Sequence, residues 1–389
     1  MTHSALPHRH REPLFSHLIH ALIGFVRHNT VFCIAFLAAL ATLPLVPPSR
    51  AYLDYLDYRT LACLFATLAV VGALKNVSFF LSVAKKIVRT FRTLRSASVA
   101  LVIITFVGSM LIANDMALIT FLPLGWLVLK ETNNQKYTAF IFIMQNISAN
   151  LGGMLTPFGN PQNLYLYSHF NIPTAEFTRI MFPPFLLAVL LIIGITYFLL
   201  PKASLQLSDD GQKPLPTLRV TLYLVLFAMA LCMVFRLIPV ILCISIIVIA
   251  LAVMDRHALL EVDYPLLLTF VCFFIFASNM SRIDAVQSLF SSLLSREPLL
   301  FSVLSCQFIS NVPSAILLSN FTGNYAALLI GVNIGGAGTL IASLASLITF
   351  REFGNRQPNQ ARRYILLFSV LNFSILGILF LFSKFVLGY

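Results

Sequence analysis

Long apolar runs recur from one end of the chain to the other, and they constrain its fold more than any other feature. Each run is roughly 16 to 22 residues long, which is enough to cross, or nearly cross, about 30 Å of bilayer hydrocarbon as a helix. Of the 389 residues, 59% are hydrophobic and only 10% are charged. A soluble domain needs far more charge to cover its surface. The sequence therefore predicts an all-α integral membrane protein.

The net charge of +12 would suit a nucleic-acid-binding protein, but the positions of the basic residues exclude that class. Lys and Arg lie in short segments between the apolar runs, as the positive-inside rule requires. If the N-terminus is cytoplasmic, 19 of the 26 basic residues face the cytoplasm. We therefore expect a multi-pass protein of the bacterial inner membrane in contact with lipid, with a cytoplasmic N-terminus and a periplasmic C-terminus.

The chain divides into two halves around a polar linker. We interpret residues 1–28 as a basic cytoplasmic segment, 29–200 as a first repeat, 201–217 as a cytoplasmic linker, and 218–389 as a linking span with a second repeat. The apolar stretch from about 30 to 46 is long for a signal peptide and has no clear cleavage site, so we expect a first span there. The expected spans are about 29–46, 58–74, 180–200, 219–235, 239–254, 264–280 and 364–384.

Each half also contains two apolar stretches that are interrupted by polar residues or glycine. Residues 98–129 and 298–322 are interrupted at Ala113-Asn114-Asp115 and at Ser310-Asn311-Val312-Pro313, and we expect re-entrant hairpins whose tips are buried in protein. Residues 137–170 and 324–350 are interrupted by glycines, and we expect two half-helices around an unwound centre. A basic loop is expected at 351–363, and interfacial segments at 77–95 and 281–296.

The interrupted segments of the two halves align with each other. The run from Asn150 to Thr156 aligns with the run from Asn333 to Thr339, and the tip at Ile112 aligns with the tip at Ile309. The charge pattern places the ends of the first hairpin inside and those of the second outside. The sequence therefore predicts two inverted copies.

A helix that is interrupted within a membrane leaves backbone donors and acceptors unpaired. Its N-terminal ends attract anions, and its C-terminal ends attract cations. Side-chain amides near such ends can donate to an anion or accept from a cation. The candidate ligands with amide side chains are Asn114, Asn150, Asn311 and Asn333. Further candidates are Thr156, Thr339, Asn160, Asn163, Ser310, Ser343 and Ser346.

Asp115 is the acidic residue that we place inside the membrane, at the tip of the first hairpin. A buried carboxylate costs roughly 2.5–3.5 kcal/mol on insertion scales and usually has a function. It could bind a proton or Na⁺, with Asn114 and Asn311 as further Na⁺ ligands, or it could cap a helix. An ionised Asp115 would repel an anionic substrate, and a bound cation would relieve that repulsion. His169, at a span end, is a candidate pH sensor, and Arg282 and Asp284 are expected to pair at the interface.

The run from Ala149 to Asn163, together with both hairpin tips, resembles the signature of the ion transporter superfamily. Ala113-Asn114-Asp115 is more similar to the arsenite/antimonite permease and citrate-transporter-like branch than to dicarboxylate carriers. The resemblance implies an elevator mechanism, commonly in a homodimer. It also places substrate and ion ligands at the tips and unwound centres, and so adds Gly159 and Val312 to the candidates.

We therefore expect a secondary active transporter of a small anion or oxyanion coupled to H⁺ or Na⁺, without any other cofactor. The alternative is a cation/proton antiporter of the Na⁺/H⁺ type that has no organic substrate. A channel would need a continuous hydrophilic pore lining, which is not evident. An intramembrane enzyme would need a nucleophile with a base, paired carboxylates or metal-spaced ligands. Asp115 stands alone, so we do not expect an enzyme.

Overall fold

The computed structural model describes residues 24–26, 29–205 and 215–389. Most of the predicted N-terminal segment and residues 206–214 of the predicted linker lie outside these ranges. Within them the chain is helical, with a single isolated β-bridge between Thr93 and Ser204. Among the described residues, six helical stretches are long and apolar enough to cross a membrane: Arg50–Asn76, Leu94–Ile112, Thr174–Leu199, Thr217–Val234, Arg256–Ser281 and Pro358–Val386.

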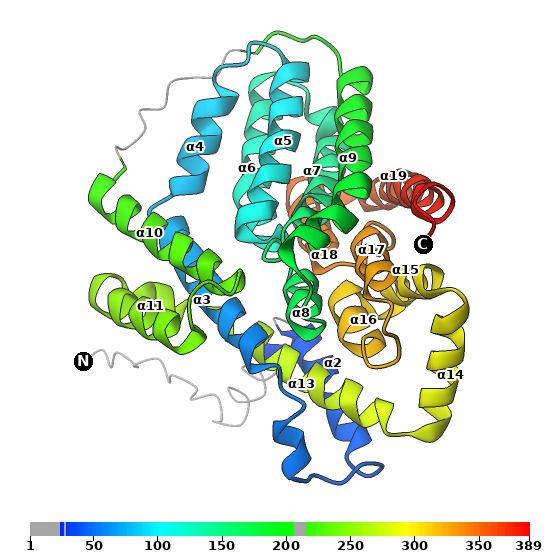
Figure 1. The fold of residues 1–389 in the computed structure, drawn as a ribbon. Helices are drawn as coiled ribbons and strands as arrows, with labels where there is room; N and C mark the ends of the chain where they lie inside the picture. Colours follow the sequence, from blue (N-terminus) through cyan, green and yellow to red (C-terminus); the bar gives the residue numbers. More distant parts are fainter. Residues whose placement is uncertain (1–23, 27–28, 206–214) are drawn as a thin grey trace, which may run out of the picture.

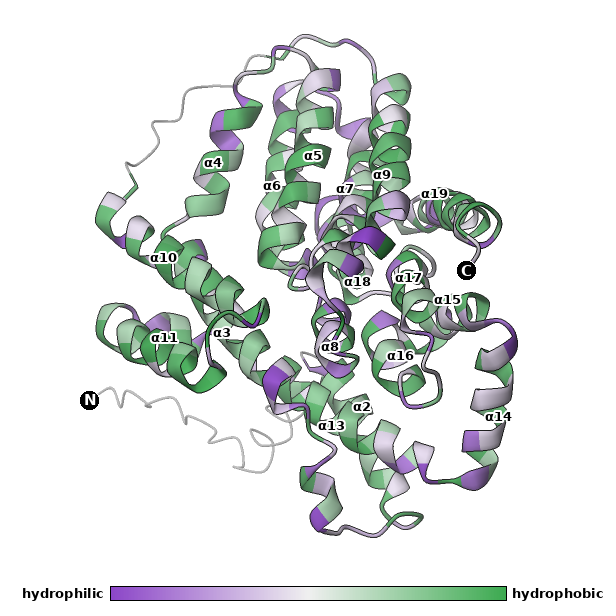
Figure 2. Ribbon diagram, viewed as in Figure 1, coloured by the Kyte–Doolittle hydropathy of each residue, from purple (hydrophilic) through white to green (hydrophobic). Residues whose placement is uncertain are grey.

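The helices form two groups, which lie side by side in Figure 1. The first group, here called the peripheral layer, consists of α2 (Thr30–Thr42), α3 (Tyr58–Asn76), α10 (Thr217–Val234), α11 (Val240–Met254), α12 (Arg256–Leu260) and α13 (Tyr264–Ser281). Helix α3 contacts α10, α11 and α13, and α13 packs along α2. The helices of this layer are mostly apolar, as the green ribbon in Figure 2 shows. Apolar side chains such as Ile241 and Val253 are 83% and 82% exposed.

The second group, here called the core bundle, contains two runs of helices in the same order. The first run is α5 (Leu94–Ile112), α6 (Asn114–Glu131), α7 (Thr138–Gly152), α8 (Pro161–His169) and α9 (Thr174–Leu199). The second run is α15 (Pro298–Ile309), α16 (Asn311–Leu318), α17 (Tyr325–Gly335), α18 (Leu344–Arg356) and α19 (Ala361–Leu381). The amphipathic helices α4 (Phe79–Val88) and α14 (Asp284–Arg296) connect the peripheral layer to the core bundle (Figure 1).

A helical hairpin forms at each predicted place, and each turns on a single residue. Helix α5 is itself long and apolar enough to cross a membrane, so the re-entrant path of these hairpins stays a prediction. Ala113 joins α5 to α6 with φ 64° and ψ 156°, and Ser310 joins α15 to α16 with φ 74° and ψ 161°. This backbone region is otherwise occupied almost only by glycine, and it costs other residues about 1–3 kcal/mol. The sharp turn lets a new helix begin directly at Asn114 and at Asn311.

Both predicted broken helices are present as well. Helix α7 ends at Gly152, and α8 begins at Pro161 after a short 3₁₀ turn, while α17 ends at Gly335 and α18 begins at Leu344. Every residue of α7 is buried, because this helix runs through the middle of the core bundle. A side chain at Gly152 would place its Cβ 2.7 Å from the Phe106 carbonyl oxygen, so a glycine is needed for α7 to approach α5.

Three local expectations are wrong. The basic segment after 350 is not all loop, because α18 continues to Arg356, which pairs with Glu352 one turn earlier at 2.8 Å. Helix α2 ends at Thr42 rather than near 46, because the next residues turn back and the Leu45 amide donates to the Thr42 carbonyl at 3.1 Å. Arg282 stacks on the Tyr55 ring at 5.3 Å, and no ion pair joins it to Asp284 in the described structure.

Candidate functional site

Each hairpin tip places an asparagine at the first position of a helix. Asn114 and Asn311 are both buried, and each Oδ1 accepts a hydrogen bond from the next backbone amide, at 3.0 Å for Asp115 and 2.9 Å for Val312. Asn114 Nδ2 then donates to Asn150 Oδ1 at 3.1 Å. The tip of the first hairpin is thereby fixed against the break in α7.

Asn150 connects three elements. Its Oδ1 accepts from Asn114 and also from the Ser343 hydroxyl at 2.7 Å, and its backbone carbonyl accepts from Asn160 Nδ2 at 3.3 Å. Ser343 precedes α18, and Asn160 precedes α8. The last turn of α7 therefore holds the starts of α6, α8 and α18 together.

Asn333 has the corresponding place in the second half. Its Nδ2 donates to Asn163 Oδ1 at 2.6 Å. Its Oδ1 accepts from the side-chain nitrogens Asn160 Nδ2 and Gln162 Nε2, both at 3.4 Å. Asn163 in turn donates to the Gly153 carbonyl at 3.0 Å. Five of the predicted residues thus form one hydrogen-bonded cluster, here called the amide network: Asn114, Asn150, Asn160, Asn163 and Asn333.

The second hairpin tip borders this network. The Asn311 backbone amide donates to the Ala342 carbonyl at 2.9 Å, and the Ser310 hydroxyl donates to the same oxygen at 3.2 Å. Ala342 directly precedes Ser343. A Cβ at Gly336 would lie 3.1 Å from Asn311 Nδ2, so a side chain there would crowd the tip asparagine.

Four helix N-termini converge here, and this is the main electrostatic feature of the site. Helices α6, α8, α16 and α18 all begin at residues of the amide network or next to them, and none of the four is closed by a side-chain bond from its N-cap. Each N-terminus carries a partial positive charge. At α16 the Asn311 and Val312 amides already donate to the Ala342 carbonyl and to Asn311 Oδ1, so this helix contributes its dipole rather than free donors. Together they form a region suited to an anion or to the oxygen atoms of a polar solute.

Thr156, Thr339 and Gly159 lie at the edges of the site, in supporting positions. The Thr156 hydroxyl donates to the Met110 carbonyl at 3.0 Å, and the Thr339 hydroxyl donates to the Gln307 carbonyl at 3.1 Å. Both acceptors lie four residues before a tip asparagine, so each threonine ties an unwound segment to its hairpin. A Cβ at Gly159 would overlap the Gly153 carbonyl oxygen, which leaves no room for a side chain.

Asp115 lies in the first turn of α6 and makes no helix cap. Its Oδ1 is buried and has no hydrogen-bond partner among the described residues. The same is true of Asn150 Nδ2, Asn160 Oδ1 and Gln162 Oε1. A buried polar atom without a partner costs about 1–3 kcal/mol, so these atoms favour a bound solute, ion or water. The equivalent residue of the second tip is Val312, so of the two tips only the first has an ionisable side chain.

Two glutamines were not among the predicted site residues. Gln162 lies between Asn160 and Asn163 in the same motif, and this position in the sequence could have identified it as a site residue. Gln307 spans the second break: its Oε1 accepts from the Thr339 amide at 2.8 Å, and its Nε2 donates to the Gly335 carbonyl at 2.9 Å. Its only sequence signal is its place one helical turn before Asn311.

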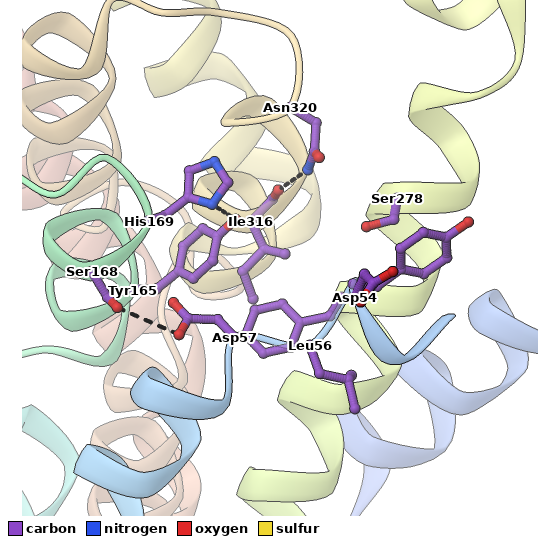
Figure 3. Close-up of a pocket in the computed structure, with 11 residues that line it drawn as sticks. Asp54, Leu56, Asp57, Tyr165, Ser168, His169, Ser278, Ile316 and Asn320 are labelled. Carbon is purple, nitrogen blue, oxygen red and sulfur yellow. Dashed lines mark hydrogen bonds between the residues drawn. The ribbon is translucent and has the colours of Figure 1, made fainter. Parts of the chain in front are cut away.

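A polar pocket of about 360 Å³ lies where the core bundle meets the peripheral layer (Figure 3). Helices α8 and α16 both end at it, and His169 lies six residues beyond Asn163 of the amide network, or about 9 Å at 1.5 Å per residue of α8. Ser168 and His169 line it from α8, and Asp57 lines it from the start of α3, with the Ser168 hydroxyl 3.4 Å from Asp57 Oδ1. The His169 ring stacks on Tyr165, and Nδ1 lies 3.3 Å from the Tyr165 hydroxyl. His169 therefore lies outside the amide network.

Comparison with known proteins gives a consistent result. The family described as "Citrate transporter" matches residues 19–330. An uncharacterized transporter of Methanocaldococcus jannaschii is 32% identical over 314 residues, which cover 80% of this chain and 85% of that protein. Inner membrane protein YbiR of Escherichia coli is 29% identical over 77% of this chain and 81% of its own length. The silicon efflux transporter LSI3 of Oryza sativa subsp. japonica is 31% identical over 34% of this chain and 26% of its own length.

Proposed function

Because the chain belongs to the citrate transporter family, and is therefore a multi-pass membrane transporter rather than an enzyme, we propose that it carries a small anion or oxyanion by secondary active transport. The substrate site is the amide network with the two hairpin tips. The observation that carries this proposal is the convergence of four helix N-termini around Asn150, whose buried Nδ2 donor has no partner among the described residues.

The substrate is a citrate-like carboxylate or an arsenite-like oxyanion. Side-chain amides and helix N-termini donate hydrogen bonds to either class. The site residues that contact one another include no Lys or Arg, so the positive potential comes from helix ends alone. Half-helix ends supply only partial charges. This favours a small or partly protonated acid over a fully ionised one.

Asp115 carries the coupling ion, either H⁺ or Na⁺. Its unpartnered oxygen lies beside Asn114, whose amide belongs to the network, so an anion bound there is repelled while Asp115 is ionised. Loading Asp115 with a cation removes that repulsion. If the ion is Na⁺, Asn114 and Asn311 add oxygen ligands.

The movement is of the elevator type, in which the core bundle slides against the peripheral layer. The grouping of helices supports this, since α4 and α14 connect the two groups at equivalent places in each half (Figure 1). The two runs of the core bundle are inverted repeats, and the transporter is a homodimer of the bacterial inner membrane with its N-terminus in the cytoplasm.

A cation/proton antiporter is the second candidate, and one observation favours it. Three of the four unpartnered buried atoms at the site are oxygens, on Asp115, Asn160 and Gln162. Oxygen atoms suit a hard cation. In this alternative, Asp115 exchanges H⁺ for Na⁺ without an organic substrate.

Thermal stabilisation of the purified protein distinguishes the two candidates, because a ligand of the folded state raises its stability by mass action. The panel comprises citrate, dicarboxylates, arsenite, phosphate and sulfate, each with and without Na⁺ and across a pH series. An anion-dependent shift that is lost in Asn311→Ala but kept in Asn324→Ala, a cap outside the site, supports anion transport at the tips. Shifts with Na⁺ or pH and none with any anion establish the antiporter instead.

A further inference from the structure

A second cavity, of about 220 Å³, lies at the flank of the core bundle, away from the amide network. It is enclosed by the starts of α7 and α19 and by the end of α9. The nearest lining residue on α7, Phe140, lies ten residues before Asn150, or about 15 Å at 1.5 Å per residue. It is therefore separate from the substrate site, and a role for it is independent of the proposed function.

The polar side of this cavity is positively charged. Lys136 and Arg363 both line it, no acidic residue does, and neither cation forms an ion pair in the described part of the chain. Helices α7 and α19 begin here, at Thr138 and Ala361, without a side-chain cap from Tyr137 or Gln360. Their N-terminal partial charges add to those of the two cations.

The other side of the cavity is apolar and is open to the outside. Phe140, Leu199 and Leu367 form it, and Leu199 is 60% exposed. Leu366, beside Leu367, is 61% exposed, so the wall continues onto the outer surface of α19. Lys136 lies over the Tyr137 ring at 5.2 Å, and such an aromatic ring is typical of the headgroup level of a membrane.

We propose that this cavity binds an anionic phospholipid, with its phosphate between Lys136 and Arg363 and its acyl chains along Phe140, Leu199 and Leu367. A soluble anion would use only the polar side, whereas a lipid matches both sides at once. Basic pockets between membrane helices are recurring sites for anionic lipid headgroups. The bound lipid joins α7, the central helix of the core bundle, to α9 and α19.

The test uses the full-length protein, delipidated in a neutral detergent, and measures the melting temperature on addition of phosphatidylglycerol or phosphatidylcholine with matched chains. We expect phosphatidylglycerol to raise the melting temperature by several degrees more than phosphatidylcholine does. The double variant Lys136→Gln/Arg363→Gln should lose most of that difference. Native mass spectrometry should show fewer retained anionic lipids on this variant.

The matched control is Lys130→Gln/Arg362→Gln. It also removes two exposed positive charges, which lie near Lys136 and Arg363 in the sequence but do not line the cavity. This control should keep the wild-type response. An equal loss in both double variants would mean that overall charge attracts the lipid, and it would overturn the proposal. The proposal would also be overturned by an equal shift with inorganic phosphate or glycerol phosphate that the Lys136→Gln/Arg363→Gln variant loses, because this cavity would then be a site for a soluble anion.

Discussion

Arg236 allows a sharp test of how the peripheral layer is held against the core bundle. It lies in the tight turn between α10 and α11 with φ 64°, a left-handed conformation that favours glycine. Its Nη2 donates to the Tyr167 carbonyl at 2.8 Å, and its guanidinium group lies 4.5 Å from the Tyr167 ring centroid. The side chain therefore caps the C-terminal end of α8, where a positive charge is favourable.

Two opposing terms set the expected magnitude. The left-handed backbone costs a non-glycine residue about 1–2 kcal/mol. A hydrogen bond from a charged donor contributes about 1.5–3 kcal/mol, and a cation–π contact adds roughly 0.5–2 kcal/mol. Arg236→Gly relieves the backbone cost and loses the contacts, which gives a net destabilisation of about 1–3 kcal/mol. Arg236→Ala loses the contacts and keeps the backbone cost, so it should be about 1 kcal/mol less stable than Arg236→Gly.

The assay is equilibrium unfolding of the purified protein in mixed micelles of a neutral and a denaturing detergent. The expected order of stability is wild type, then Arg236→Gly, then Arg236→Ala. A glycine variant as stable as the wild type would refute the reasoning. The Arg236 contacts to α8 would then contribute no more free energy than the left-handed backbone at residue 236 costs. A double-mutant cycle with Tyr167→Leu isolates the ring contact, since the backbone carbonyl of residue 167 remains.

Two further predictions concern the site itself. In proteoliposomes, Asp115→Asn should abolish the dependence of transport on pH or Na⁺ while the protein still folds. The control Asp284→Asn, which changes an exposed carboxylate, should behave as wild type. Unchanged coupling in Asp115→Asn would remove this carboxylate from the mechanism. Gly159→Ala should destabilise the protein by about 1–3 kcal/mol or prevent folding, because its Cβ would overlap the Gly153 carbonyl oxygen. Gly194→Ala, with open space around its Cβ, should be neutral or slightly stabilising, and equal stability of the two variants would contradict the close approach at Gly159.

The hairpins and broken helices could be predicted because their signals are local. A polar tripeptide or a glycine pair inside an apolar run is visible without any tertiary knowledge, and the structure places turns at Ala113 and Ser310. The end of α18 could not be located in this way, because an Arg356–Glu352 pair extends the helix through a segment whose composition is typical of a basic loop. The residue that spans the second break could not be predicted from the sequence either. Gln307 acts through atoms of residues 335 and 339, some 28 and 32 positions away, and no pattern within its own helix indicates that pairing.

On the proposed mechanism, comparing the two tips explains how one site would both attract an anion and respond to a cation. The backbone is nearly the same on both sides: each tip turns on a non-glycine residue with positive φ, each tip asparagine accepts from the next amide, and each unwound segment is tied back by a threonine. This duplicated backbone supplies the helix N-termini, and hence the positive potential, in equal measure from both halves. The side chains that follow the asparagines differ, since Asp115 is ionisable and its counterpart Val312 is not. On the proposed mechanism, the charge that must be neutralised for an anion to bind is therefore a single carboxylate on the first hairpin.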